Sequence, residues 1–80
     1  MPPKQAINII GPRVRLARQR RIPALTQDEL SGQLAAYGVL LDRSAVSKVE
    51  SGTRYVSDFE VRALSKVLGV SPAWLLGMEK

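Results

Sequence analysis

Two helix-start signals constrain the fold of this chain more than any other feature of its sequence. Thr26 stands three positions before Glu29, and Ser57 stands three positions before Glu60. In this pattern, the capping box, the hydroxyl and the glutamate each satisfy a backbone N–H at the start of a helix. The two patterns therefore predict helices that begin at residues 26 and 57.

Three further helices are predicted from caps and breakers. The first covers about residues 9–21, because Pro23 ends it and pushes the preceding residue to extended geometry. Another begins at Asp42, a good N-cap, and ends at Gly52. A short helix begins at Ser71, near the end of the sequence. No segment reads as a strand, so the predicted fold class is a compact all-α domain of five helices.

Apolar residues at helical spacing predict the core. They are Ile10, Val14, Ala17, Leu30, Leu34, Val46, Val49, Val61, Leu64, Val67 and Leu68. In a domain this small, Trp74 is expected to close the core as part of the last helix. Leu75 and Leu76 cannot both be fully buried beside it, and Tyr37 is expected to pack on the edge of the core.

The composition excludes several classes of protein. A chain of 80 residues forms one domain, and without cysteine it has neither disulfides nor thiolate metal sites. Because it also lacks histidine and a Gly-rich phosphate loop, we expect neither an enzyme nor a metal or cofactor site. No window approaches the ~18 apolar residues of a membrane helix, and the start of the sequence lacks the features of a signal peptide, which predicts a cytoplasmic protein.

The charge is positive and unevenly distributed. Twelve Lys and Arg against seven Asp and Glu give a net charge of +5. Residues 1–27 hold no acid, and their basic residues are Lys4, Arg13, Arg15, Arg18, Arg20 and Arg21. This asymmetry suits a polyanionic partner, either a nucleic acid or an anionic membrane face, although a solvated basic helix gives the same pattern.

Three stretches of sequence, in chain order, resemble the phage-repressor/Cro-like helix-turn-helix family, also called XRE. They are TQDELSGQL, DRSAVSKVESG and LSKVLGVSPAWLLG, and the resemblance covers about residues 10–77. The resemblance implies a lambda-repressor-like DNA-binding domain whose second and third helices form the helix-turn-helix. This domain is expected over residues 9–80, after a flexible N-terminal tail of residues 1–8.

The connection between the second and third helices departs from the family pattern. About five extra residues fall within residues 35–41, so either the second helix or the loop is longer than usual. Two helices that cross near a tight turn need a small residue at their closest approach, and Ser31 stands where the family often has alanine.

The third predicted helix carries the candidate base-reading residues. Its side opposite the apolar seam holds Arg43, Ser44, Ser47 and Lys48. Arg43 follows the Asp42 cap at the leading tip, where a guanidinium can bind guanine O6 and N7 in a bidentate manner. Its alternatives are a phosphate contact and an ion pair with Asp42. The resemblance implies base-reading positions at Ser44 and Lys48 as well, and Ser47 lies beside them.

The resemblance also implies contacts to the DNA backbone and one structural ion pair. The candidate phosphate-binding residues are Gln27, Ser51, Thr53, Arg54 and Arg13. A solvated glutamine at position 27 and a turn role for Thr53 stay open as alternatives. Arg18 matches the family arginine that pairs with a glutamate at the end of the third helix, here Glu50, and such a pair would hold the helices together.

The resulting hypothesis is a sequence-specific DNA-binding transcriptional regulator. The resemblance implies a repressor that binds a palindromic operator as a homodimer, with the third helix in the major groove. The expected partners are double-stranded DNA and a second copy, with no membrane and no small-molecule ligand. The dimer contact is expected at Leu75 or Leu76, with Pro72 or Met78. The alternative hypothesis is an antitoxin-type interaction module that neutralises a partner protein and autoregulates its operon.

Overall fold

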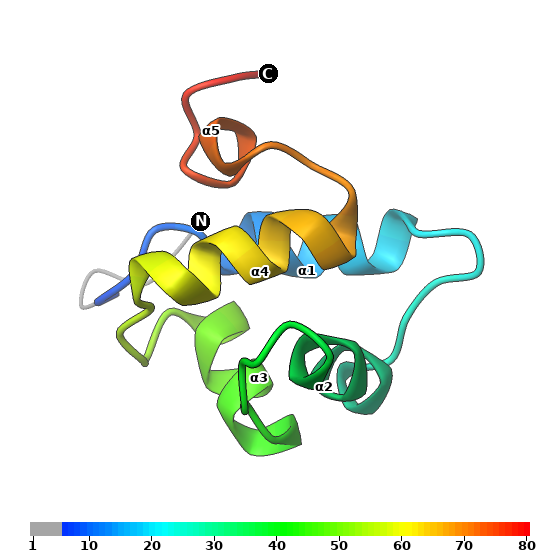
Figure 1. Cartoon of the computed structure of the whole chain (residues 1–80). Helices are drawn as coiled ribbons and strands as arrows, with labels where there is room; N and C mark the ends of the chain where they lie inside the picture. The colour runs from blue at the N-terminus through cyan, green and yellow to red at the C-terminus, as the bar shows by residue number, and fades with distance from the viewer. Residues whose placement is uncertain (1–5) are drawn as a thin grey trace.

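The computed structural model describes residues 6–80, which form five α-helices and, within that range, no strand (Figure 1). The helices are α1 (Gly11–Arg20), α2 (Gln27–Ala35), α3 (Arg43–Ser51), α4 (Asp58–Leu68) and α5 (Pro72–Leu75). The predicted all-α fold with five helices in this order is confirmed. Within residues 6–80, no helix is long and apolar enough to span a bilayer.

Four of the five helices, α2 to α5, begin where the sequence places their caps. The Thr26 hydroxyl accepts from the Glu29 backbone N–H, and the Glu29 carboxylate accepts from the Thr26 N–H. This backbone hydrogen bond from Thr26 lowers the pKa of Glu29. Ser57 forms the same reciprocal pair at the start of α4. The Asp42 side chain likewise caps α3, so each of these starts is fixed by a contact within one helical turn.

The start of α1 lies two residues later than predicted and is capped from further upstream. The Asn8 side-chain oxygen accepts from the Ile10 and Gly11 backbone N–H groups, at 3.1 and 2.9 Å. The Ile7 N–H donates to the Gly52 carbonyl at 2.8 Å. Residues 6–8 were predicted to belong to the flexible tail, but they are held against the end of α3. The rest of that predicted tail, including Lys4, lies outside the described residues.

The five helices pack around one apolar core. Figure 1 shows α4 alongside α1 in the middle of the molecule, with α2 and α3 on one side of this pair and α5 on the other. The buried apolar residues are Ile10, Val14, Ala17, Leu25, Leu30, Leu34, Leu41, Val46, Val49, Ala63, Leu64, Val67, Leu68 and Leu75. Ten of the eleven predicted core positions are on this list, and the eleventh, Val61, is partly buried against it. Trp74 is also partly buried against the core, as expected for a side chain that closes it.

The extra residues after α2 lengthen the loop and not the helix. The helix ends at Ala35, and Gly38 then takes a φ of 78°, a left-handed conformation that favours glycine. The expected packing of Tyr37 against the core is wrong, because this turn leaves its side chain in solvent, 53% exposed. Leu41 returns the chain to the core, and its carbonyl accepts from the Ser31 hydroxyl. The loop thus ends anchored to α2, directly before the Asp42 cap.

Candidate nucleic-acid interface

The polar face of α3 is free of the rest of the domain. Its exposed residues include the four predicted base-reading positions Arg43, Ser44, Ser47 and Lys48. Within residues 6–80, these four side chains make no hydrogen bond or ion pair, so the alternative pairing of Arg43 with Asp42 is not formed. The opposite face of α3 is buried in the core, which fixes the rotation of the helix about its axis.

The N-terminal ends of α2 and α3 meet at one surface hollow. Arg43 lines this hollow of about 430 Å³ together with Thr26, Gln27, Asp28 and Arg18. The predicted phosphate-binding position at the start of α2 and the leading arginine of α3 are therefore neighbours on one surface. Helix N-termini attract anions because their first N–H groups lack helical partners.

The carboxylate of Glu50 is the polar centre of the contact between α1, α2 and α3. Its side chain is completely buried, and the Arg18 guanidinium donates to its two oxygens at 2.7 and 3.0 Å. Gln27 Nε2 and Arg15 Nε also donate to it, at 3.1 and 3.3 Å. Burial of Glu50 by itself raises its pKa, but the hydrogen bonds from these three side chains and the charge of Arg18 outweigh burial and lower the pKa below its usual value.

Arg18 holds three parts of the fold together. Its guanidinium donates a further hydrogen bond to the Leu25 carbonyl at 2.9 Å, so it also holds the segment that leads into α2. The hydrogen bond to Glu50 raises the pKa of Arg18. The ion pair that the resemblance implies between Arg18 and Glu50 is thus present, and it ties α1 to the end of α3.

The structure changes the expected role of the Gln27 side chain. Its amide is already bonded to Glu50, inside the cluster that joins the helices. A phosphate contact at this position can use only the second amide N–H and the backbone N–H groups of the first turn of α2. Arg15 joins the same carboxylate, which the sequence did not indicate, because a charged residue on a basic helix has no local signal for its partner.

The segment after α3 gathers the other predicted phosphate-binding residues. The hydroxyls of Ser51 and Thr53 lie 2.9 Å apart at the end of the helix. Arg54 donates to the Tyr55 carbonyl at 2.9 Å and forms an ion pair with Glu60 at 3.1 Å. This surface ion pair leaves about a third of the Arg54 side chain exposed, so the guanidinium still reaches solvent.

Arg13, the remaining predicted phosphate-binding residue, contacts the end of the chain. It donates to the Trp74 carbonyl at 2.9 Å and to the Glu79 carbonyl at 2.8 Å, and its guanidinium lies 4.8 Å from the centre of the Trp74 ring. Arg13 points to a different side of α1 from Arg15 and Arg18, because helical residues share a face only three or four positions apart. The structure therefore places Arg13 at the contact between α1 and the end of the chain, where its guanidinium is already engaged.

Gly11 and Asn8, which were not among the predicted site residues, fix the position of α3. A Cβ atom built at Gly11 would lie 2.4 Å from the Val49 carbonyl oxygen and 2.6 Å from that of Glu50. The Asn8 amide donates to the Val49 and Arg54 carbonyls at 3.1 and 2.9 Å. The start of α1 thus packs directly on the last turn of α3.

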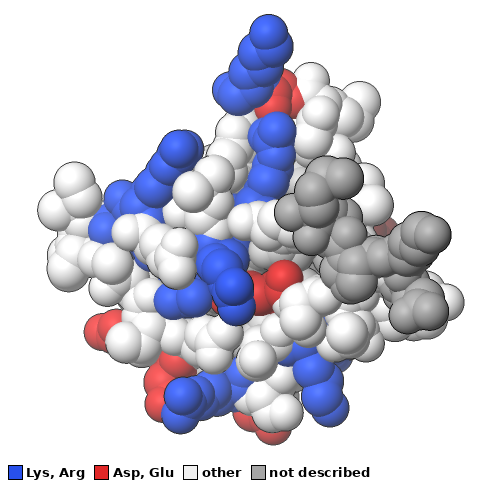
Figure 2. All heavy atoms as spheres, turned by 180° about the vertical axis from the view of Figure 1, so that it is seen from behind, with Lys and Arg blue, Asp and Glu red and all other residues white. Residues whose placement is uncertain are grey.

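Basic side chains are spread over the rear of the molecule. Figure 2 shows them from the α5 end at the top to the α2–α3 end at the bottom, with fewer acidic side chains between them. Among residues 6–80, no three acidic side chains come together in a way that could hold a metal ion. The excess of positive charge on this surface suits a polyanionic partner.

Helix α3 has a free polar face, its start lies next to the start of α2, and Glu50 ties it to α1. This arrangement defines a helix-turn-helix domain. Residues 18–75 match the family model described as "Helix-turn-helix", and the chain belongs to the Cro/C1-type helix-turn-helix family, XRE. It is accordingly a DNA-binding regulator of this type. No curated protein and no solved structure matches the chain.

Proposed function

We propose that the protein is a sequence-specific transcriptional repressor that binds a palindromic operator as a homodimer. The observation that carries this proposal is the exposed polar face of α3, whose four candidate side chains have no partner within residues 6–80. A recognition helix reads base edges with its N-terminal residues in the major groove. Arg43 stands at that end of α3, and the other three follow it on the same face.

The proposed backbone contacts lie at the start of α2 and just after α3. At the start of α2, the N–H groups of the first turn and the positive end of the helix dipole suit a phosphate. After α3, Ser51 and Thr53 offer hydroxyls and Arg54 offers a positive charge. Contacts of this kind set the register of a protein on DNA, while base contacts supply the sequence preference.

The proposed dimer contact uses the end of the chain. Leu75 is buried in the core, so it is removed from the candidate dimer residues. Leu76 and Met78 are 38% and 77% exposed and supply apolar surface close together in the sequence. Two-fold symmetry is the commonest arrangement of soluble oligomers, and it presents two recognition helices to two half-sites.

A selection from randomised duplex DNA at near-physiological salt tests this proposal. We expect enrichment of a two-fold symmetric motif with half-sites about one helical turn apart. Enrichment of a single half-site would support sequence-specific binding and would contradict binding as a homodimer. If only weak, salt-sensitive binding without enrichment were found, the base-reading role of α3 would be overturned.

A matched pair of variants makes the selection specific to α3. The Arg43→Ala variant is expected to lose or relax the motif at one base pair of each half-site. The Arg62→Ala variant removes the same charge from an exposed position of α4 and is expected to leave the motif unchanged. A motif altered equally by both variants would argue against the reading of bases by α3.

A further inference from the structure

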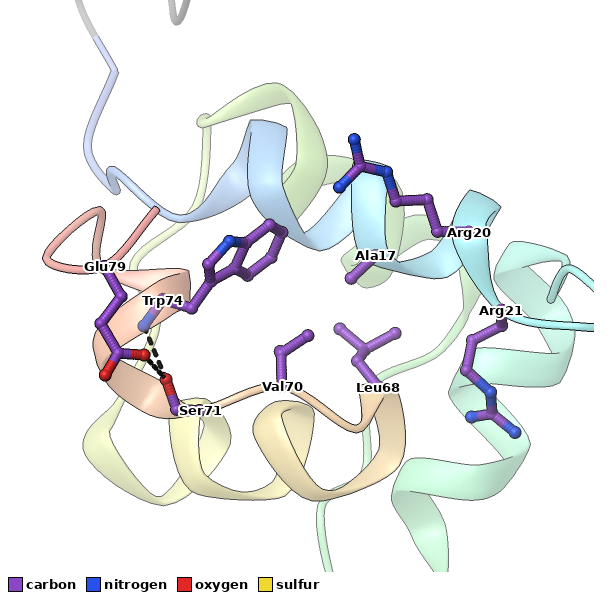
Figure 3. Close-up of a pocket in the computed structure, with 8 residues that line it drawn as sticks. All are labelled: Ala17, Arg20, Arg21, Leu68, Val70, Ser71, Trp74 and Glu79. Carbon is purple, nitrogen blue, oxygen red and sulfur yellow. Dashed lines mark hydrogen bonds between the residues drawn. The ribbon is translucent and has the colours of Figure 1, made fainter.

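A cavity of about 420 Å³ opens between α1 and the segment that joins α4 to α5 (Figure 3). Its lining residues are Ala17, Arg20, Arg21, Leu68, Val70, Ser71, Trp74 and Glu79. None of them belongs to α2 or α3, so the cavity is separate from the proposed DNA-binding face. Its volume falls in the range of about 300–1,000 Å³ that is usual for small-molecule sites.

The floor and one wall of the cavity are apolar. Ala17 and Leu68 are buried core residues, and Val70 and Trp74 are partly buried against the same core. Figure 3 shows the Trp74 indole at one end of the cavity, with Val70 and Leu68 across from Ala17. Such a surface favours the apolar body of a ligand, since its burial removes both surfaces from water.

The two arginines of the rim differ in their availability. The Arg21 guanidinium donates to the Val67 carbonyl, and Figure 3 shows it directed away from Trp74. Arg20 makes no hydrogen bond or ion pair within residues 6–80. Figure 3 shows its side chain at the α1 edge of the cavity, running toward the Trp74 end but on the side of α1 away from Val70 and Leu68. Arg20 therefore offers a planar set of donors, unused within residues 6–80, at the rim of the cavity.

The acidic residue of the rim does not neutralise this arginine. The Glu79 carboxylate accepts from the Ser71 hydroxyl, and no ion pair joins it to either arginine. The Glu79 carbonyl is held by Arg13 in addition. The positive charge at one end of the cavity is thus left for a ligand.

We propose that this cavity binds a small carboxylate that carries an aromatic or aliphatic body. The carboxylate would bind the Arg20 guanidinium, whose fork of donors matches the two oxygens of a carboxylate. The body would lie against Trp74, Val70 and Leu68. This ligand site goes beyond the proposed DNA binding and revises the sequence-based expectation that no small molecule is bound.

The fluorescence of Trp74 reports directly on this site, because it is the only tryptophan of the chain. We would titrate the full chain with three carboxylates, 3-phenylpropionate, 4-phenylbutyrate and octanoate. The control is 4-phenylbutanamide, the uncharged amide of 4-phenylbutyrate. At least one carboxylate is expected to give a saturable change, and the amide is expected to bind about tenfold more weakly, as for a lost hydrogen bond to a charged group. Equal binding of acid and amide, or no saturable change with any carboxylate, would overturn the proposal.

Two variants separate the site from a general charge effect. Arg20→Gln keeps an exposed polar side chain and is expected to weaken carboxylate binding about tenfold while leaving amide binding unchanged. Arg62→Gln makes the same charge change on α4, outside the cavity, and is expected to leave both affinities unchanged. Equal weakening by the two variants would overturn the assignment of the carboxylate to Arg20.

Discussion

Arg18 and Glu50 are 32 positions apart in the sequence and are joined by hydrogen bonds of 2.7 and 3.0 Å. The pair ties α1 to the last turn of α3, next to the point where Gly11 packs on the same turn. Because α3 is held both by this pair and by its buried apolar face, its free polar face has one orientation relative to α2. We therefore expect the ion pair to affect DNA binding through the position of the helix and not through contact with DNA.

Removal of Glu50 should be costly, because it leaves the guanidinium of Arg18 without its partner. The side chain of Arg18 is only 12% exposed, and we expect Glu50→Ala to lower the free energy of unfolding by about 3 kcal/mol. Urea denaturation measures this loss. Arg15→Ala removes a donor that is 56% exposed from the same carboxylate, and its expected loss is below about 1 kcal/mol. If Glu50→Ala and Arg15→Ala lost the same free energy of unfolding, the ion pair between Arg18 and Glu50 would not stabilise the fold more than the exposed one does.

The low pKa of Glu50 predicts a loss of stability in acid. A carboxyl group whose pKa is lower in the folded protein stabilises it above the unfolded pKa, near 4.5, and this contribution disappears as the pH falls through the folded value. The difference in unfolding free energy between wild type and Glu50→Gln should therefore be largest at neutral pH and shrink below about pH 4.5. Urea titrations of both proteins along a pH series measure it. A difference independent of pH would contradict the assignment.

A side chain at Gly11 should separate α1 from α3. Because the two obstructing atoms are backbone carbonyl oxygens, they cannot move aside without shifting the end of α3. We expect Gly11→Ala to lower the free energy of unfolding by about 2 kcal/mol. Gly32, in the middle of α2, has open space around its Cβ position, so Gly32→Ala is expected to raise stability by about 0.5–1 kcal/mol. Thermal or urea unfolding of the two variants should give opposite signs.

Arg43 should contribute to the sequence preference of DNA binding. We expect Arg43→Ala to weaken binding to the selected operator by about 1–3 kcal/mol and to relax the preference at one base pair. Binding to a random duplex should change much less, which fluorescence anisotropy with both duplexes measures. An equal loss on the two duplexes would assign Arg43 to a phosphate instead.

Arg54 should act on all DNA sequences alike. If its guanidinium neutralises one phosphate, Arg54→Ala is expected to reduce the slope of log K against log salt by about 0.9. The surface ion pair with Glu60 is worth less than about 1 kcal/mol, so the variant should remain folded. Arg62→Ala provides the control of equal charge change. An unchanged slope in Arg54→Ala would place Arg54 outside the phosphate contacts.

Much of the fold could be predicted from the sequence because its causes are local. The capping boxes at Thr26 and Ser57 each involve residues three positions apart, and both are formed. The apolar spacing within each helix likewise identified the buried face, because the period of a helix is fixed. The exposure of the α3 residues around Arg43 follows from the same spacing.

Contacts between distant segments could not be predicted from these local rules. Asn8 has no sequence signal for its bonds to the end of α3, and the direction of Arg13 toward Trp74 depends on where α5 packs. The sequence also left open whether the extra residues after Ala35 extend the helix or the loop.

The sequence by itself determined the starts of α2 to α5, the apolar faces and the family, because these depend on residues close together in the chain. The tertiary structure alone decided which polar side chains share a partner, as Gln27 and Arg15 share Glu50 with Arg18. It also brought Arg20 and Trp74 to the lining of one cavity. The physical reason is that a charged or amide side chain bonds to whichever group packing brings within about 3 Å, and packing is a property of the whole chain.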